Sequence, residues 1–214
     1  MTKRPARKSR PRKSRPGKAP SIASSSLVER LRARLAEARR QIADLKQHAD
    51  TDVLLDIQNR RGFERELRRS LAYVKRYHAT AALLYVDVDH LKPINDRHGH
   101  AAGDAALKAI AAELIAHVRM SDIVARLGGD EFGILLWNLK PADAEKKARA
   151  LEAAVDGLRF SVRGRSLRLG LSAGVTMLKR TDETADLLAR ADAAMYRRKE
   201  VRRAARRKRG VRAR

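Results

Sequence analysis

The chain has 214 residues, no cysteine and a formal net charge of +24, and 43% of its residues are apolar. This length and apolar content fit one domain of ordinary size with extensions, and the lack of cysteine excludes a disulfide framework and thiol chemistry. No apolar run approaches the roughly 18 residues of a membrane span, and no apolar segment of a secretory signal opens the chain, so we expect a cytoplasmic protein without a transmembrane segment.

Most of the positive charge lies at the two ends of the chain. Residues 1–20 carry nine lysines and arginines and no acid, and residues 197–214 carry eleven with one acid. Such runs are usually disordered and solvated, so we predict a basic disordered tail over 1–24 and a basic C-terminal tail over 204–214. They either keep the protein soluble or bind polyanions weakly, for example nucleic acid or anionic lipid.

A helix is predicted over 25–49, after a capping box formed by Ser26 and Glu29. Its apolar residues alternate at spacings of three and four, which is the seam of a two-stranded coiled coil: Val28, Leu31, Leu35, Ala38, Ile42 and Leu45. We therefore expect a dimerising coiled coil, with packing of this helix on its own domain as the alternative.

The segment 50–203 has the pattern of one α+β domain. Apolar periodicity predicts helices over 60–77, 101–120, 141–158 and 185–199, and strands over 81–91, 122–137 (a hairpin) and 167–178. The core order is βαββαβ with a helix before and after it, which predicts a ferredoxin-like palm.

Two carboxylates at separate points of this order favour a metal site. Asp87 ends the first strand, and Asp130 lies in the hairpin turn "GGDE", so adjacent strands bring them together. Carboxylate oxygens suit Mg²⁺, and Gly128 and Gly129 let a phosphate or base approach the backbone closely. The alternative is a plain acidic hairpin turn.

The stretch "DVDHLKPINDRHGHAAGD", residues 87–104, is a polar loop between a strand and a helix, where functional sites are common. Asn95 and Asp104 offer acceptors for N–H groups of a base edge, as guanine presents, and Lys92 offers a positive charge for phosphates. Zinc binding by His98 and His100 lacks support from a further ligand set.

Together these stretches resemble the GGDEF domain family, the diguanylate cyclases. The signature stands at Gly128–Phe132, residues 87–104 follow the family's D-x-D-x-F-K-x-I-N-D-x-x-G-H-x-x-G-D, and "ADAAMYRRK" resembles the closing motif. The resemblance runs from Asp52 to Arg203. It implies a palm like that of nucleotidyl cyclases.

The resemblance also implies roles for individual residues. The metal, Mg²⁺ or Mn²⁺ in its place, would be held by Asp87, Asp130 and the carbonyl of Val88. Asp130, Glu131 and Lys92 would be catalytic. Substrate-binding residues would be Asn95, His100, Asp104, Gly128, Gly129, Lys199 and Arg203.

The implied reaction joins two GTP into cyclic di-GMP and releases two pyrophosphates. Each domain would hold one GTP, so a homodimer is required. "RMSD", Arg119–Asp122, resembles the family's R-x-x-D inhibitory site for the product.

Some positions depart from the family pattern. In "DVLLDIQNRRGF" Leu55, Asp56 and Ile57 replace Thr, Gly and Leu, which puts the geometry of that turn in question. The closing G-R-N is "RRA", Arg202–Ala204. Two alternatives to the enzyme stay open: a catalytically silent domain that senses GTP or cyclic di-GMP, and a polyanion-binding protein acting through its tails.

Overall fold

The computed structural model describes residues 22–162 and 164–212. The chain divides into two units, residues 1–45 and 46–214. Its elements are α1 (Ile22–Asp50), β1 (Gln58–Asn59), α2 (Arg60–Tyr77), β2 (Ala81–Val88), α3 (Leu91–His98), α4 (His100–Ala116), β3 (Ile123–Arg126), β4 (Glu131–Trp137), α5 (Pro141–Asp156), β5 (Phe160–Val162), β6 (Arg165–Leu167), β7 (Leu171–Met177) and α6 (Thr184–Arg212).

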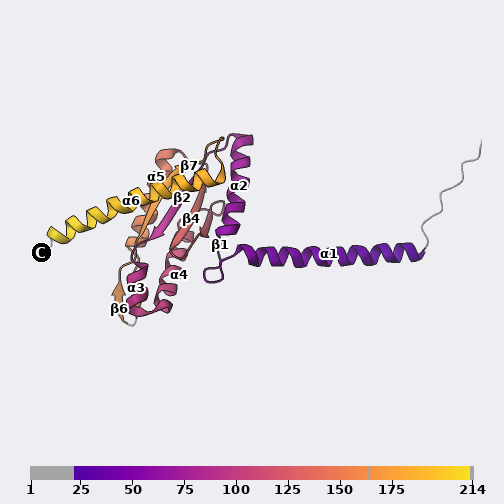
Figure 1. Ribbon diagram of the computed structural model, residues 1–214, viewed down its shortest axis with the longest axis horizontal. Helices are drawn as coiled ribbons and strands as arrows, with labels where there is room; N and C mark the ends of the chain where they lie inside the picture. Colours follow the sequence, from indigo (N-terminus) through magenta and orange to yellow (C-terminus); the bar gives the residue numbers. More distant parts are fainter. Residues whose placement is uncertain (1–21, 163, 213–214) are drawn as a thin grey trace, which may run out of the picture. The chain divides into compact units, whose positions relative to one another are not determined.

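A five-stranded sheet of order β1-β3-β4-β2-β7 forms the centre of the larger unit (Figure 1). Strand β1 is parallel to β3, and the other neighbouring pairs are antiparallel. All eight residues of β2 are buried, which explains its unbroken apolar run up to Asp87. The predicted α+β fold is confirmed.

Helices cover both faces of this sheet. One core cluster joins the sheet to α3, α4 and α5, and the other joins it to α2 and α6. Helix α2 has the predicted bounds because its local signals agree. The side chain of Asn59 accepts a hydrogen bond from the Gly62 amide, and Phe63, Leu67 and Val74 form a buried stripe at helical spacing.

Helix α1 begins at Ile22, four residues before Ser26, so the expected capping box does not mark its start. The side chains of Leu31 and Leu35 are 55% and 52% exposed. A solvent-facing pair of leucines at seam positions is what a coiled-coil partner would cover, and the dimer stays a prediction. Most of the segment expected to be a basic tail, residues 1–21, lies outside the described residues.

Four features differ from the sequence prediction. Strand β1 and the β5–β6 hairpin are too short to leave a periodic pattern, and α3 forms within residues 87–104, where we expected only a loop. Helix α6 continues to Arg212, through most of the predicted C-terminal tail, because no glycine or proline interrupts it before Gly210.

Among the described residues, no helix has the length and apolar content needed to span a membrane.

Candidate functional site

The two carboxylates predicted to meet do lie at the same end of the sheet. In the antiparallel β2–β4 pair, Asp87 is opposite Glu131, and the amide of the next residue, Val88, donates to the carbonyl oxygen of Asp130 at 2.9 Å. The register therefore places Asp130 beside the last residues of β2. The buried carboxyl of Asp87 and the half-buried Asp130 interact electrostatically.

Lys199 on α6 completes this group of charges. Its Nζ donates to Oδ1 of Asp87 at 2.5 Å. Burial raises the pKa of the Asp87 carboxyl, the bond and charge of Lys199 lower it, and the negative charges of Asp130 and Asp89 raise it again, so that the pKa lies above its usual range. A carboxylate in this setting gains from a nearby cation.

The oxygen donors fit a small divalent ion. Among the described residues no group of three or more His, Cys, Asp and Glu side chains could hold a metal, which leaves the zinc hypothesis for His98 and His100 without support. Mg²⁺, by contrast, commonly uses one or two carboxylates and takes its other ligands from water and substrate phosphates. Asp87, Asp130 and the Val88 carbonyl are such a set.

Glu131 points to a different partner. Its Oε2 accepts from Nη2 of Arg60 at 3.3 Å, while Nε of Arg60 donates to the Leu127 carbonyl at 2.7 Å. A Cβ on Gly128 would lie 2.7 Å from the same Oε2, so the Glu131 carboxylate would have to shift if any other residue stood there. Glu131 thus stabilises the turn through Arg60. No sequence pattern predicted this role for Arg60.

A second arginine, Arg126 at the end of β3, also binds the turn. Arg126 donates from Nε to the Gly128 carbonyl at 2.9 Å and from Nη2 to the Gly129 carbonyl at 2.8 Å, and its Nη1 lies 3.2 Å from Oδ2 of Asp52. The "GGDE" turn is therefore tied to the start of the domain. No spacing rule marks Arg126 in advance, because its role depends on three backbone and side-chain partners that only the fold brings together.

The turn that departs from the family pattern keeps a glycine-like conformation. Asp56, in the position of the usual glycine, has φ of 53°, and its amide donates to the Asp52 carbonyl at 2.9 Å. Oδ1 of Asp52 also accepts from the amides of Leu54 and Leu55 at 3.0 Å each. Aspartate is among the residues that tolerate left-handed backbone, so the substitution preserves the turn.

A hollow of about 300 Å³ opens beside the carboxylates. It lies between the segment after β2 and the second half of α6, and most of its charged lining is basic. Its lining includes six charged residues from these two sides and the turn: Asp89, Lys92, Asp130, Lys199, Arg202 and Arg203. Lys92 is the cation predicted to contact phosphates, and Lys199 and Arg203 are among the residues that the family resemblance assigns to the substrate.

The residues expected to read guanine lie on α3 and α4, outside the lining of that hollow. Oδ1 of Asn95 is buried and has no hydrogen-bond partner among the residues that the structure describes. A Cβ on Gly103 would lie 1.8 Å from this oxygen, so only glycine leaves room for the amide. Asp104 and His100 are exposed. The α3–α4 pair therefore carries two groups that could accept hydrogen bonds from a base, the buried Oδ1 of Asn95 and the exposed carboxylate of Asp104.

The R-x-x-D segment is held by its aspartate. Oδ2 of Asp122 accepts from the Arg119 amide at 2.9 Å, and Oδ1 accepts from the Trp137 amide at 3.1 Å. Arg119 is exposed, and both residues line a shallow hollow of about 140 Å³. The segment thus forms a fixed turn that presents the exposed side chain of Arg119 to solvent. It lies at the opposite end of β4 from Asp130.

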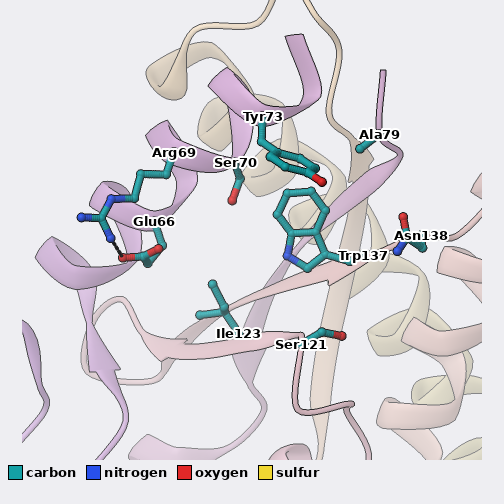
Figure 2. Close-up of a pocket in the computed structure, with 9 residues that line it drawn as sticks. All are labelled: Glu66, Arg69, Ser70, Tyr73, Ala79, Ser121, Ile123, Trp137 and Asn138. Atoms are coloured by element: carbon teal, nitrogen blue, oxygen red, sulfur yellow. Dashed lines mark hydrogen bonds and ion pairs between the residues drawn. The ribbon is translucent and has the colours of Figure 1, made fainter. Parts of the chain in front are cut away.

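A larger hollow of about 470 Å³ lies beside this segment, between α2 and the β3–β4 pair. Figure 2 shows the ring of Tyr73 above that of Trp137, and the two centroids are 5.6 Å apart in an edge-on arrangement. Arg69 is paired with Glu66 at its rim, at 2.8 Å. None of the residues predicted to bind substrate lines it.

Comparison with known proteins identifies relatives over most of the chain. The family described as "Diguanylate cyclase, GGDEF domain" matches residues 49–205. "Probable diguanylate cyclase DgcE" of Escherichia coli is 39% identical over 163 residues, covering 76% of this chain and 15% of DgcE. "Diguanylate cyclase TpbB" of Pseudomonas aeruginosa is 38% identical over 175 residues, covering 80% of this chain and 40% of TpbB. The chain therefore spans less than half the length of these curated relatives.

Solved structures agree with the fold. The GGDEF domain of TpbB from Pseudomonas aeruginosa is 40% identical and superposes with a TM-score of 0.66, covering 70% of this chain and 88% of that one. The coiled coil and GGDEF domain of DgcB from Caulobacter crescentus, in complex with cyclic di-GMP, superposes with a TM-score of 0.73 at 24% identity, covering 82% of this chain and 94% of that one. At that identity the second likeness concerns the fold alone.

Proposed function

Because the chain belongs to the GGDEF domain family of diguanylate cyclases, we propose that it condenses two GTP into cyclic di-GMP and releases two pyrophosphates. The observation that carries the proposal is the meeting of Asp87 and Asp130 beside a hollow lined by Lys92, Lys199 and Arg203. A polyphosphate needs both parts, an oxygen-ligand metal site and nearby cations. Here they stand side by side.

Asp87, Asp130 and the carbonyl of Val88 would hold the Mg²⁺, with Mn²⁺ as a possible substitute. When bound, the metal offsets the negative charge that grows on the phosphates during transfer. Lys92, Lys199 and Arg203 bind and orient the same triphosphate. Lys199 donates to Asp87 and also lines the hollow, where it would contact a phosphate oxygen.

Guanine binding is assigned to the α3–α4 pair. The buried Oδ1 of Asn95 lacks a hydrogen-bond donor, and leaving such an acceptor unpaired costs about 1–3 kcal/mol. The N–H groups of guanine would satisfy it, with Asp104 accepting from a second donor on the same edge. His100, Gly128 and Gly129 are assigned to the surroundings of the nucleotide.

Each chain supplies one nucleotide site, so the reaction needs two chains facing each other. The 3′-oxygen of one GTP forms a bond to the α-phosphorus of the other, and the bond from that phosphorus to the β-phosphate bridging oxygen breaks and releases pyrophosphate. We assign Asp130 to receive the hydroxyl proton. Glu131 keeps the turn that presents Asp130 in place through Arg60.

Product inhibition is assigned to Arg119 and Asp122. Asp122 is occupied by two backbone amides, which fixes the turn, whereas the exposed Arg119 guanidinium is available for a phosphate or a guanine edge. Binding of cyclic di-GMP there would hinder the approach of the two half-sites.

A direct test incubates the purified chain, stripped of co-purified nucleotide, with GTP and Mg²⁺ and resolves the products by chromatography. Cyclic di-GMP is expected from the wild type and none from Asp130→Ala, while Asp192→Ala, an exposed carboxylate on α6, should behave like the wild type. If the wild type binds GTP but makes no product, the chain is a nucleotide-sensing domain and the enzymatic proposal fails.

A further inference from the structure

Arg202 is held by three carboxylates that come from two other parts of the domain. Its Nη2 donates to both oxygens of Asp156 at 2.6 and 2.8 Å, and its Nη1 donates to Oε2 of Glu152 at 3.3 Å. Its Nε lies 3.6 Å from Oδ2 of Asp89. The Arg202 side chain is only 12% exposed. One guanidinium on α6 therefore joins α5 to the segment that follows β2.

Glu152 makes this a buried network and not a set of surface pairs. Its carboxyl is 2% exposed and also accepts from Arg198 at 2.5 Å, from Arg149 at 2.7 Å and from the Ala173 amide of β7 at 3.0 Å. Exposed pairs contribute little, whereas a buried network of charged hydrogen bonds fixes the relative position of the elements that form it. Glu152 therefore joins α5 to α6 and to β7. The contact of Arg202 with Asp89 is an ion pair without a hydrogen bond, since their nearest atoms lie 3.6 Å apart.

The third carboxylate, Asp89, connects the network to the site. Oδ1 of Asp89 accepts from Oγ of Ser172 at 3.2 Å, and its amide donates to the Gly170 carbonyl at 2.8 Å. Asp89 follows Val88 directly and lies three residues before Lys92, so its segment forms one wall of the 300 Å³ hollow. Lys199 and Arg203, three residues before and one after Arg202, belong to the opposite wall.

We propose that Arg202 is a positioning residue for the triphosphate: by joining α6 to α5 and to Asp89, it sets the distance between the two walls of the hollow. The proposal rests on the function proposed above. Arg202 acts through its neighbours, since both of its terminal nitrogens already bind carboxylates. The family pattern has glycine at this position, and glycine could make none of these bonds. This connection between the two walls therefore requires a long basic side chain at position 202.

The bonding pattern also predicts that lysine cannot replace Arg202. A guanidinium is planar and can donate to three acceptors in different directions, whereas an ammonium is a compact point charge. The attraction of Asp156, Glu152 and Asp89 raises the pKa of Arg202 even though burial lowers it, so the side chain stays charged. A lysine at this position would keep the charge but could not bind carboxylates of both walls at once.

The experiment compares Arg202→Gln and Arg202→Lys with Arg197→Gln, an exposed arginine of the same helix, in the full chain. For both Arg202 variants we expect the KM for GTP to rise about tenfold and kcat to change less than about threefold, as for loss of uniform binding. Affinity for α,β-methylene-GTP, which cannot release pyrophosphate, should fall equally, while GMP affinity stays unchanged. Circular dichroism and the thermal midpoint confirm that each variant is folded.

A double-mutant cycle with Asp156→Asn tests whether Arg202 acts through its contact with Asp156. If the two residues act through one contact, Arg202→Gln with Asp156→Asn should bind α,β-methylene-GTP no more weakly than Arg202→Gln alone. Additive losses would overturn the proposal, and so would a lysine variant that binds like the wild type, or equal losses for GMP. If the wild type makes no cyclic di-GMP but these binding differences hold, the enzymatic function fails and the positioning role stands.

Discussion

Lys199 places its Nζ 2.5 Å from Oδ1 of Asp87, a residue 112 positions earlier in the chain. The bond joins the second half of α6 to the end of the central strand β2, and both side chains are largely shielded from water. Because Asp87 also lies near Asp130 and Asp89, Lys199 offsets part of the mutual repulsion of these carboxylates. This arrangement leads to the first prediction.

Lys199→Met should lower the free energy of unfolding by about 1–3 kcal/mol at neutral pH, because a shielded carboxylate loses its partner. Urea denaturation measures the loss, with Lys146→Met on the exposed side of α5 as control. Addition of Mg²⁺ should stabilise the variant more than the wild type, since a cation that binds only the folded state raises stability. Equal effects of Mg²⁺ on both proteins would contradict a metal site at Asp87.

Gly103→Ala should impair guanine binding through Asn95. The added methyl group would lie 1.8 Å from Oδ1 of Asn95, so the amide must move away. We expect the Kd for GTP to rise at least tenfold, which corresponds to about 1.4 kcal/mol. Calorimetric titration with GTP provides the measurement. Gly157→Ala is the matched control, because its added methyl group meets nothing closer than an ordinary 3.4 Å contact. Unchanged GTP affinity in Gly103→Ala would remove Asn95 from the site.

Arg119→Ala should relieve product inhibition without changing the initial rate. In the wild type, the progress curve should flatten as cyclic di-GMP accumulates, and added product should reproduce the effect. The variant should stay active at product concentrations that stop the wild type, because the exposed guanidinium that pairs with phosphate is gone. Lys108→Ala, an exposed cation on α4, serves as control. Equal inhibition in the wild type and Arg119→Ala would place the inhibitory site elsewhere.

Local signals predicted the parts of the fold in which neighbouring residues agree with one another. Helix α2 has both a cap at Asn59 and a buried apolar stripe, and β2 is a continuous apolar run between polar ends. Helix α3 was missed because Pro93 and its many polar residues resemble a loop, although proline is tolerated in the first turn of a helix. The strands β5 and β6 have three residues each and are too short to show alternation.

The site divides in the same way. Asp87 and Asp130 were predictable because strand ends and a hairpin turn are local features whose pairing follows from topology. Arg60, Arg126 and Arg202 were not, because an arginine shows no sign in the sequence of which carboxylate or carbonyl it will reach. Their partners lie between 2 and 113 positions away, as with the Gly128 carbonyl for Arg126 and Asp89 for Arg202.

Stability should depend on pH through Asp182. Arg190 donates to both oxygens of Asp182, at 2.6 and 2.8 Å, and the Lys179 amide adds a bond at 2.8 Å. These bonds hold the pKa of Asp182 below its usual range. A lowered folded-state pKa gives stability that is fully present above the unfolded pKa of about 3.9 and is lost as pH falls through the folded value.

Asp182→Asn should therefore cost about 1.5–3 kcal/mol at pH 7, the usual contribution of hydrogen bonds to a charged group. The difference from the wild type should shrink at pH 3, below the unfolded pKa of about 3.9, because the unfolded chain then binds a proton at this carboxyl. Urea denaturation at both pH values measures it, and Asp192→Asn, an exposed carboxylate of the same helix, should show neither effect. A difference that stays constant with pH would mean that the charge of Asp182 contributes nothing.

Substitution of the α1 seam should separate the two half-sites. Leu31→Glu with Leu35→Glu places two charges on exposed positions that a coiled-coil partner would cover, whereas Ala33→Glu with Ala36→Glu adds the same charge on the other side of the helix. Light scattering should show a dimer for the wild type and the alanine control and a monomer for the leucine variant. Turnover of the leucine variant should fall at least about tenfold at low protein concentration and recover as concentration rises, because the helix normally supplies a high effective concentration. A monomeric variant with undiminished turnover would show that the domains meet without α1.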